Sequence, residues 1–262
     1  MRWSERVFVA EGIELARTAF SANVVPEAIF LASGSSDDRH VAELVEWTLS
    51  KGARVFELAP GVAERVADTV TPPAVFCIHR MLDVGIDDVD RSLVIVCVDV
   101  RDPGNAGTVI RTADAAGAGA VVFTGGSVDP YNPKTVRSTA GSIFHVALVV
   151  ATDSNEAIHA LQEKGTCCVG SVIRGGDDYR TFDWDRSTAI VIGNEARGLP
   201  ASTLESLDGL VGIPMAGRAE SLNVAVACAV LCFEAVRNRS TMPGMSKQSA
   251  SDPDRPATRP DS

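Results

Sequence analysis

Aromatic residues and positive charges are both scarce in this sequence of 262 residues. Only 5% of the residues are aromatic, but 45% are hydrophobic, enough to bury a sizeable core in one large domain or two smaller ones. Residues 1–80 carry 8 basic and 11 acidic residues, and residues 81–239 carry 13 and 20. The net charge of −10 argues against capture of nucleic acid by the overall field. Any contact with RNA must therefore come from local patches.

Long apolar runs and paired cysteines are also missing. No run approaches the ~18–20 apolar residues of a membrane-spanning helix, and the opening residues MRWSERVFVAEG lack the apolar core of a secretion signal. We therefore expect a cytoplasmic protein that binds no membrane. The cysteines lie in apolar stretches without a C-x-x-C pair, which predicts reduced core residues and no metal site. They are Cys77, Cys97, Cys167, Cys168, Cys228 and Cys232.

Strand and helix patterns alternate along most of the chain, which predicts an α/β fold: a small α/β unit first, then a larger unit with a mainly parallel sheet covered by helices on both faces. The acidic, turn-prone stretch 83–92 divides this alternation, so we place a boundary near residue 85, between a domain of residues 1–84 and one of residues 85–239. From Ser240 the composition becomes too poor in apolar residues to fold. Residues 240–262 are therefore predicted to be a disordered tail.

The first segment with chemical character is DVRDPGNAGTVIRTADAAGA, residues 99–118, where a buried strand runs into a helix expected at about 106–117. The dinucleotide pattern G-x-G-x-x-G and the phosphate-loop pattern G-x-x-x-x-G-K-[ST] are both absent, which removes the main support for those two kinds of nucleotide site. Asn105 stands at the expected helix start, as an N-cap would, and Arg111 follows about two turns later. Each residue by itself is more typical of a structural role than of a catalytic one.

A second segment, AIVIGNEARGLP at residues 189–200, is an apolar strand that ends in Gly193, Asn194 and Glu195. Glycine at the carboxyl end of a strand permits close approach of a ligand, and open α/β sheets bind ligands at such ends. Glu195 is equally compatible with a simple first-turn acid that favours a helix dipole.

The third segment, residues 212–236, stops a strand and begins an apolar helix. Ser221 is well placed as the N-cap of this helix, and Asn223 is a poor helix former that packing does not explain. The stripe Val224, Cys228, Leu231 and Cys232 belongs to the core or to a dimer interface.

Together, in order and spacing, the three segments resemble the three motifs of the SpoU (TrmH-like) branch of the SPOUT methyltransferases. The likeness covers residues 90–239 and rests on the combination of PGNAGTVIRTADAAGA, IGNEARGLP and IPMAGRAESLNVAVA. Residues 1–80 are similar, through FVAEG and TVTPPAVF, to the L30e-like substrate-binding domain of several rRNA-modifying members. The basic arm that usually precedes F-x-x-E-G is reduced to Arg2 and Arg6, and Ala147 and Ala74 stand where members often have Pro and Gly.

This resemblance implies a deep trefoil knot in the catalytic domain, a rare exception to unthreaded connections, and a homodimer. It implies S-adenosyl-L-methionine as the cofactor, held by backbone groups near four residues, and no metal. These residues are Val172, Gly193, Ile213 and Leu222.

The implied activity is methylation of a ribose 2′-hydroxyl of RNA, with 23S rRNA favoured by the N-terminal domain. Arg111 would stabilise the developing alkoxide and clamp a phosphate, since guanidinium is effectively never deprotonated. Asn105, Glu195, Ser221 and Asn223 would position it and the ribose. Lys134 and Arg137 are candidates for phosphate contacts or else solvated cations.

Three other functions are compatible with parts of the sequence. A tRNA 2′-O-methyltransferase would share the same core. A non-catalytic RNA- or S-adenosylmethionine-binding protein would not need Arg111 and Glu195 together, and a dinucleotide-dependent oxidoreductase would need the missing glycine pattern.

Overall fold

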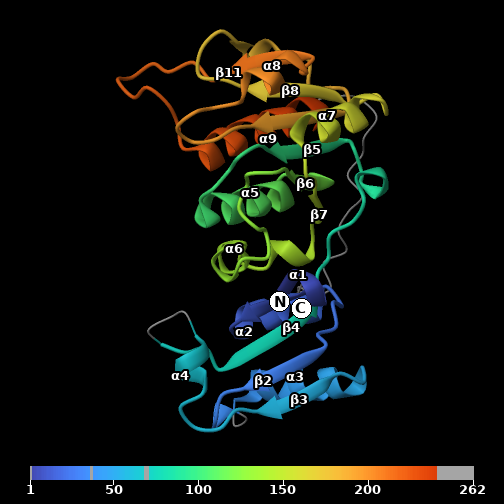
Figure 1. Ribbon diagram of the computed structural model, residues 1–262, viewed down its shortest axis with the longest axis vertical. Helices are drawn as coiled ribbons and strands as arrows, with labels where there is room; N and C mark the ends of the chain where they lie inside the picture. The colour runs from blue at the N-terminus through green and yellow to red at the C-terminus, as the bar shows by residue number, and fades with distance from the viewer. Residues whose placement is uncertain (1, 36–37, 68–70, 241–262) are drawn as a thin grey trace, which may run out of the picture.

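Two β-sheets, one in each half of the chain, organise the protein. The computed structural model describes residues 2–35, 38–67 and 71–240. Figure 1 shows the N-terminal sheet at one end of the long axis and the larger C-terminal sheet at the other. Of the predicted tail, Ser240 is the last residue of a helix, and residues 241–262 lie outside the described residues.

The N-terminal sheet has the strand order β1-β4-β2-β3. Strand β4 runs antiparallel to both β1 and β2, and only β2 and β3 are parallel. This half is thus a small α/β unit with a mixed sheet, because β4 inserts between β1 and β2 in the reverse direction. The elements are α1 Arg2–Glu5, β1 Val7–Glu11, α2 Ile13–Ser21, β2 Ala28–Leu31, α3 Arg39–Ser50, β3 Arg54–Glu57, α4 Ala63–Val66 and β4 Val75–Arg80.

The second sheet is parallel throughout its seven strands, in the order β7-β6-β5-β10-β8-β11-β9, and it confirms the predicted α/β class. Its strands are β5 Leu93–Cys97, β6 Ala120–Phe123, β7 Ala147–Val150, β8 Cys167–Ser171, β9 Asp177–Asp178, β10 Thr188–Ile192 and β11 Gly209–Gly212. The helices are α5 Pro103–Ala115, α6 Pro133–Ser138, α7 Ser154–Gln162, α8 Ala201–Glu205 and α9 Val224–Ser240.

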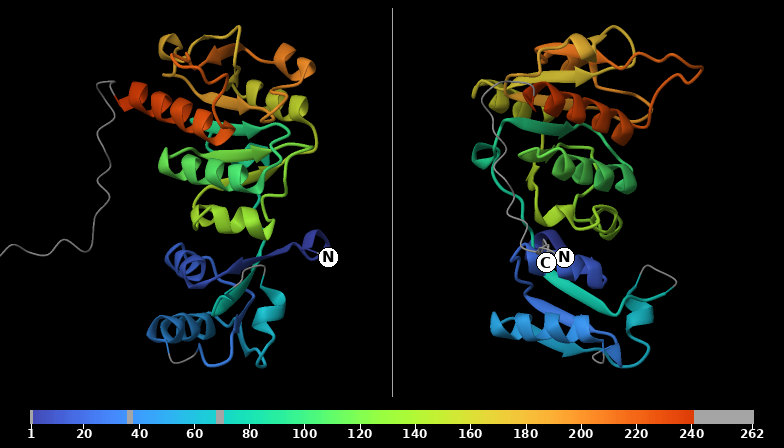
Figure 2. Two further views of the ribbon diagram at one scale, coloured as in Figure 1. Left: turned by 90° about the vertical axis from the view of Figure 1, so that its left-hand side faces the viewer. Right: turned by 180° about the vertical axis from the view of Figure 1, so that it is seen from behind.

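Helices cover both faces of this sheet, as Figure 2 shows. Along β5 the side chains alternate between faces, as the two-residue period of a strand requires. Leu93, Ile95 and Cys97 join the core that includes α5 and α9, whereas Val94 and Val96 join the core that includes α7. Every residue of β5 and β10 is buried, so these two central strands are apolar without interruption.

An aromatic cluster joins the two halves. The Phe8 ring of β1 lies 5.0 Å from the Tyr131 ring and 6.2 Å from the Phe144 ring, measured between centroids. The Tyr131 hydroxyl donates to Asp83 and accepts from the backbone N–H of Leu82. The buried rings and these hydrogen bonds hold the N-terminal sheet against the second half of the chain.

His79 of β4 lies fully buried within this cluster, where its ring stacks on Phe8 at 5.5 Å and lies tilted against Phe144 at 5.1 Å, measured between centroids. Among the described residues neither of its ring nitrogens has a hydrogen-bond partner. Burial lowers the pKa of His79 from the ordinary 6.5 to about 4. The unfolded chain therefore takes up more protons than the folded chain between these two values. The contribution of neutral, buried His79 to the free energy of unfolding is complete above about pH 6.5 and is lost as the pH falls through about 4.

We expect the free energy of unfolding to fall by up to about 3 kcal/mol from this group as the pH drops from 7 to 4. His79→Phe keeps an aromatic ring in the stack but cannot bind the proton, so its urea unfolding should depend less steeply on pH than that of the wild type. His159→Gln, on the exposed side of α7, is the matched control and should follow the wild type. Equal pH dependence in all three proteins would contradict the assignment.

Candidate active site

Helix α5 begins at Pro103, three residues before the predicted start at about residue 106. Asp102 is the N-cap of α5, because its carboxylate accepts from the backbone N–H of Asn105 at 2.8 Å. Pro103 occupies the first turn, where its missing N–H costs nothing. The interpretation of Asn105 as a cap is therefore wrong, and its side-chain amide is free to bond elsewhere.

Gly193 lies directly after β10, at a point where no side chain fits. A Cβ built there would lie 2.5 Å from the carbonyl carbon of Gly198 and 2.6 Å from both the Gly198 oxygen and the Leu199 nitrogen. These are backbone atoms, and they are fixed in turn by the paired hydrogen bonds between Asn194 and Gly198. The glycine thus lets the loop 193–198 fold back tightly on itself, with Glu195 at its tip.

Helix α9 begins at Val224, and its N-cap is Asn223 rather than the predicted Ser221. The Asn223 side-chain oxygen accepts from the N–H of Ala225 at 2.9 Å, which satisfies a donor of the first turn. This explains why an Asn stands there. Ser221 is exposed, and its hydroxyl has no hydrogen-bond partner among the residues that the structure describes.

The three loops meet in a chain of side-chain hydrogen bonds. The Asn105 amide donates to Glu195 at 2.9 Å, and the Asn223 amide donates to the Asn105 oxygen at 2.9 Å. The bonds join residues that are 90 and 118 positions apart in the sequence. Three of the five predicted catalytic residues therefore form one polar chain, called here the Glu195–Asn105–Asn223 chain.

An open cavity of about 650 Å³, its mouth included, lies beside this chain. All four predicted cofactor residues line it: Val172, Gly193, Ile213 and Leu222. The first three follow the carboxyl ends of β8, β10 and β11, where parallel sheets bind ligands. Glu195 and Ser221 also line the cavity, as do Asn194 and Glu220, to which the sequence reasoning gave no role.

The remaining predicted site residues lie outside the cavity. Arg111 is exposed on α5 and makes no hydrogen bond or ion pair with any described residue. Lys134 is exposed on α6, and Arg137 of the same helix forms an ion pair with Glu11 of β1 at 3.6 Å. The structure thus leaves Arg111 and Lys134 available to a ligand and shows that Arg137 also connects the two halves.

No helix among the described residues is long and apolar enough to cross a membrane. No group of three or more His, Cys, Asp or Glu side chains within 2–35, 38–67 and 71–240 could hold a metal ion.

The fold and the site define an α/β protein with a cavity at the carboxyl ends of its parallel strands and with a carboxylate and two amides beside that cavity. The chain belongs to the SpoU rRNA Methylase family, which matches residues 92–233. It is 33% identical over 232 residues to the 23S rRNA (guanosine(2553)-2′-O)-methyltransferase RlmP of Bacillus subtilis, with 88% of this chain and 89% of that one covered.

Solved structures of similar proteins cover nearly the whole chain. An AdoMet-bound rRNA methyltransferase from Sinorhizobium meliloti matches with a TM-score of 0.81 and 32% identity, over 90% of this chain and 89% of that chain. The SpoU methyltransferase AviRb from Streptomyces viridochromogenes, in complex with the cofactor AdoMet, matches with a TM-score of 0.80 and 28% identity, over 92% and 94% of the two chains. The predicted SpoU and SPOUT resemblance is confirmed.

Proposed function

We propose that this protein transfers the methyl group of S-adenosylmethionine to a ribose 2′-hydroxyl of 23S rRNA. The observation that carries the proposal is the Glu195–Asn105–Asn223 chain at the wall of a cavity lined by all four expected cofactor residues. The relatives named for 2′-O-methylation of 23S rRNA support the same reaction and substrate.

The cavity suits the cofactor. Its lining combines apolar side chains with a few polar groups, as the lining of ordinary ligand pockets does. Backbone groups of Gly193 and the neighbouring strand ends can reach the polar edge of an adenine, and Val172, Ile213 and Leu222 offer apolar cover for its faces. When bound, S-adenosylmethionine supplies an activated methyl group.

The protein's own residues must position the nucleophile and stabilise its charge, because a 2′-hydroxyl is a poor nucleophile at neutral pH. Arg111 keeps its proton, so it acts by stabilising the developing alkoxide and holding the adjacent phosphate. The Glu195–Asn105–Asn223 chain orients both amides, since Glu195 can only accept and Asn105 must then present its oxygen to Asn223. Ser221 is exposed at the same wall, which supports its proposed contact with the ribose.

Tritium transfer from labelled S-adenosylmethionine tests the reaction. We expect transfer to unmodified 23S rRNA transcript and none to tRNA transcripts, and mapping of 2′-O-methyl positions in deletion and wild-type cells should locate one missing site in rRNA. Transfer to tRNA alone would show that the substrate is tRNA and not 23S rRNA. Cofactor binding without transfer to either RNA would favour the non-catalytic alternative.

We further propose the division into an L30e-like RNA-binding domain of residues 1–84 and a knotted catalytic domain of residues 85–239. The cofactor cavity draws all its residues from 171–227, so a fragment of residues 85–240 should bind S-adenosylmethionine as the full chain does. Its RNA affinity should fall sharply, because an acidic catalytic half has little general attraction for RNA. Calorimetry checks the first expectation and filter binding the second. A folded fragment that binds no cofactor would contradict this division.

We propose that the protein is a homodimer whose interface is not the apolar stripe of α9 that the sequence offered for this role. Val224, Cys228, Leu231 and Cys232 are buried within the single chain, where α9 packs on the sheet and α5. The opposite side of α9 is also apolar. Val226 and Phe233 are 49% and 50% exposed, and half-buried Val230 lies between them at helical spacing.

The wild type should therefore sediment at about 55 kDa, twice the 27.6 kDa of one chain. Phe233→Glu places a charge in the proposed interface and should shift the protein to the monomer mass at micromolar concentration. Leu49→Glu, an equally exposed apolar position on α3, is the matched control and should remain dimeric. A wild-type monomer that still methylates RNA would contradict the proposal.

A further inference from the structure

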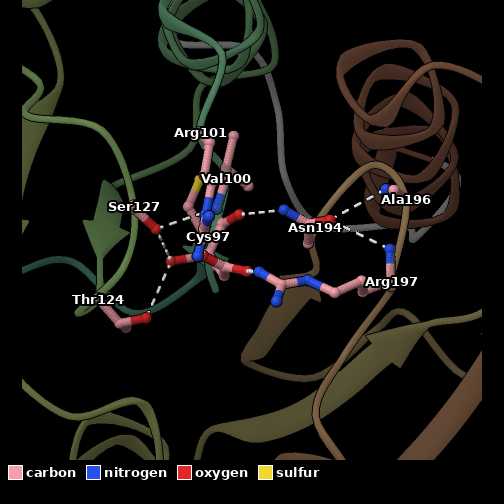
Figure 3. A network of polar contacts seen from close by, with 9 residues as sticks. Cys97, Val100, Arg101, Thr124, Ser127, Asn194, Ala196 and Arg197 are labelled. Carbon is pink, nitrogen blue, oxygen red and sulfur yellow. Dashed lines mark hydrogen bonds and ion pairs between the residues drawn. The ribbon is translucent and has the colours of Figure 1, made fainter.

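Asp99, two residues after β5, has an unusual backbone conformation. Its φ of 57° lies in the left-handed region, which costs a non-glycine residue on the order of 1 kcal/mol or more. The Asn194 side-chain amide donates to the Asp99 carbonyl at 2.9 Å, and its oxygen accepts from the N–H groups of Ala196 and Arg197. Figure 3 shows Asn194 in this bridging position. The loop after β5 and the loop after β10 are thus held together at this residue.

The Asp99 carboxylate fixes two arginines. Arg101 Nε lies 2.6 Å from one oxygen, and Arg197 Nη2 lies 2.5 Å from the other. The carboxylate is only 17% exposed, whereas the side chains of Arg101 and Arg197 are 62% and 65% exposed. Burial by itself would raise the pKa of Asp99, but the hydrogen bonds from Arg101 and Arg197 outweigh it and lower the pKa below its ordinary value. Asp99 therefore stays ionised as an anchor.

The two guanidinium groups and the one carboxylate together carry one net positive charge. Each guanidinium has five N–H donors and uses only one of them on Asp99, so most donors remain for another oxyanion. Their planar geometry suits the oxygens of a phosphate. In a chain of net charge −10, such a local pair is the kind of patch that RNA contact requires.

The pair lies on the same loops as the polar chain of the site. Arg197 follows Glu195 by two residues, and Arg101 precedes Asn105 by four. Neither arginine lines the cofactor cavity, although Asn194 and Glu195 do. An oxyanion bound by these arginines would therefore lie beside the cavity, which fits a group of the RNA better than the carboxylate of the cofactor.

We propose that Arg101 and Arg197, positioned by Asp99, bind a backbone phosphate of the RNA next to the methylated ribose. This inference rests on the proposed function, in that the chain binds RNA at this site. Arg101 and Arg197 supply the binding, and Asp99 is a positioning residue that acts through them.

The salt dependence of RNA binding tests the two arginines. The logarithm of the affinity for unmodified 23S rRNA transcript should fall less steeply with the logarithm of the KCl concentration in Arg197→Gln, by about 0.7–0.9 in slope, as one lost phosphate contact predicts. Arg186→Gln is the matched control, because Arg186 is an exposed arginine just before the opposite end of β10. It should keep the wild-type slope. An Arg197→Gln slope equal to that of Arg186→Gln would overturn the proposal.

Calorimetry with S-adenosylmethionine separates the two sources of an oxyanion. Arg197→Gln should keep the wild-type cofactor affinity. A variant that loses cofactor affinity and keeps the wild-type salt slope would assign the arginines to the cofactor carboxylate and overturn the phosphate site. RNA binding can be measured without turnover. If the wild type methylates no rRNA, the proposed reaction is refuted. A reduced salt slope in Arg197→Gln would still support the phosphate site.

Asp99→Gly tests the positioning role without straining the fold, because glycine adopts a positive φ freely. The arginines keep their charge but lose their anchor. We expect RNA affinity to stay or to tighten while kcat falls about 10-fold or more, as misplacement of a bound substrate predicts. A wild-type kcat in this variant would refute the role of Asp99.

Discussion

Arg111→Ala is expected to lower kcat by roughly 10²–10³ and to leave the affinity for S-adenosylmethionine unchanged. The fall is the size seen when one preorganised charge-stabilising donor is removed. The cofactor affinity should be unchanged because Arg111 lies on α5, outside the cavity, and its side chain makes no hydrogen bond or ion pair with the described residues. Steady-state tritium transfer to 23S rRNA measures kcat, and calorimetry measures the cofactor affinity.

Two further variants sharpen this test. Arg111→Lys keeps the charge and loses the planar fork, so only part of the activity should return. Arg186→Ala removes an equally exposed arginine far along the chain and should methylate at the wild-type rate. If Arg111→Ala also methylates at that rate, Arg111 is a solvated residue on the surface of α5.

Gly193→Ala is expected to weaken S-adenosylmethionine binding by about 10- to 100-fold, because the loop 193–198 must open to admit a methyl group. The added Cβ would lie 2.5–2.6 Å from backbone atoms of Gly198 and Leu199, which no side-chain rotation can relieve. Overpacking of this kind costs typically about 1–3 kcal/mol. Part of that cost should appear as lost stability of the loop and the rest as lost affinity.

Gly217→Ala is the matched control for this change. Nothing lies within 4 Å of a Cβ built at Gly217, and its backbone does not require a positive φ. Calorimetry should therefore give the wild-type affinity for Gly217→Ala. Circular dichroism should show that both variants remain folded. Wild-type affinity in a folded Gly193→Ala protein would mean that the cofactor does not use this loop.

The sequence predicted the lining of the cavity better than it predicted the helix ends beside it. Val172, Gly193 and Ile213 follow apolar strands, and carboxyl ends of parallel strands meet at one edge of a sheet. The predicted N-caps, Asn105 and Ser221, were wrong although both residues are good caps by type. The residues that cap the helices, Asp102 and Asn223, are equally good caps by type. Residue preference alone does not choose among neighbours of similar propensity.

The stripe on α9 was ambiguous for a related reason. Helical spacing shows that Val224, Cys228 and Leu231 share a face, but Val226 and Phe233 mark a second apolar face of the same helix. A helix that is apolar on all sides gives no sign of which face its own chain covers. Packing against α5 and the sheet decided that the first face belongs to the core.

By itself the sequence determined what depends on short stretches of chain. The alternation of strands and helices, the buried central strands β5 and β10, and the glycine at the end of β10 follow from periodicity and from local backbone conformation. Only the tertiary structure decided the reversed strand β4, the bonds of Asn105 to Glu195 and Asn223, and the capture of Arg197 by Asp99. The last three contacts join residues 90 to 118 positions apart. The contacts of Glu195 and Arg197 depend on the pairing of β10 beside β5, and the contact of Asn223 depends on the packing of α9 against α5. Local patterns encode neither arrangement.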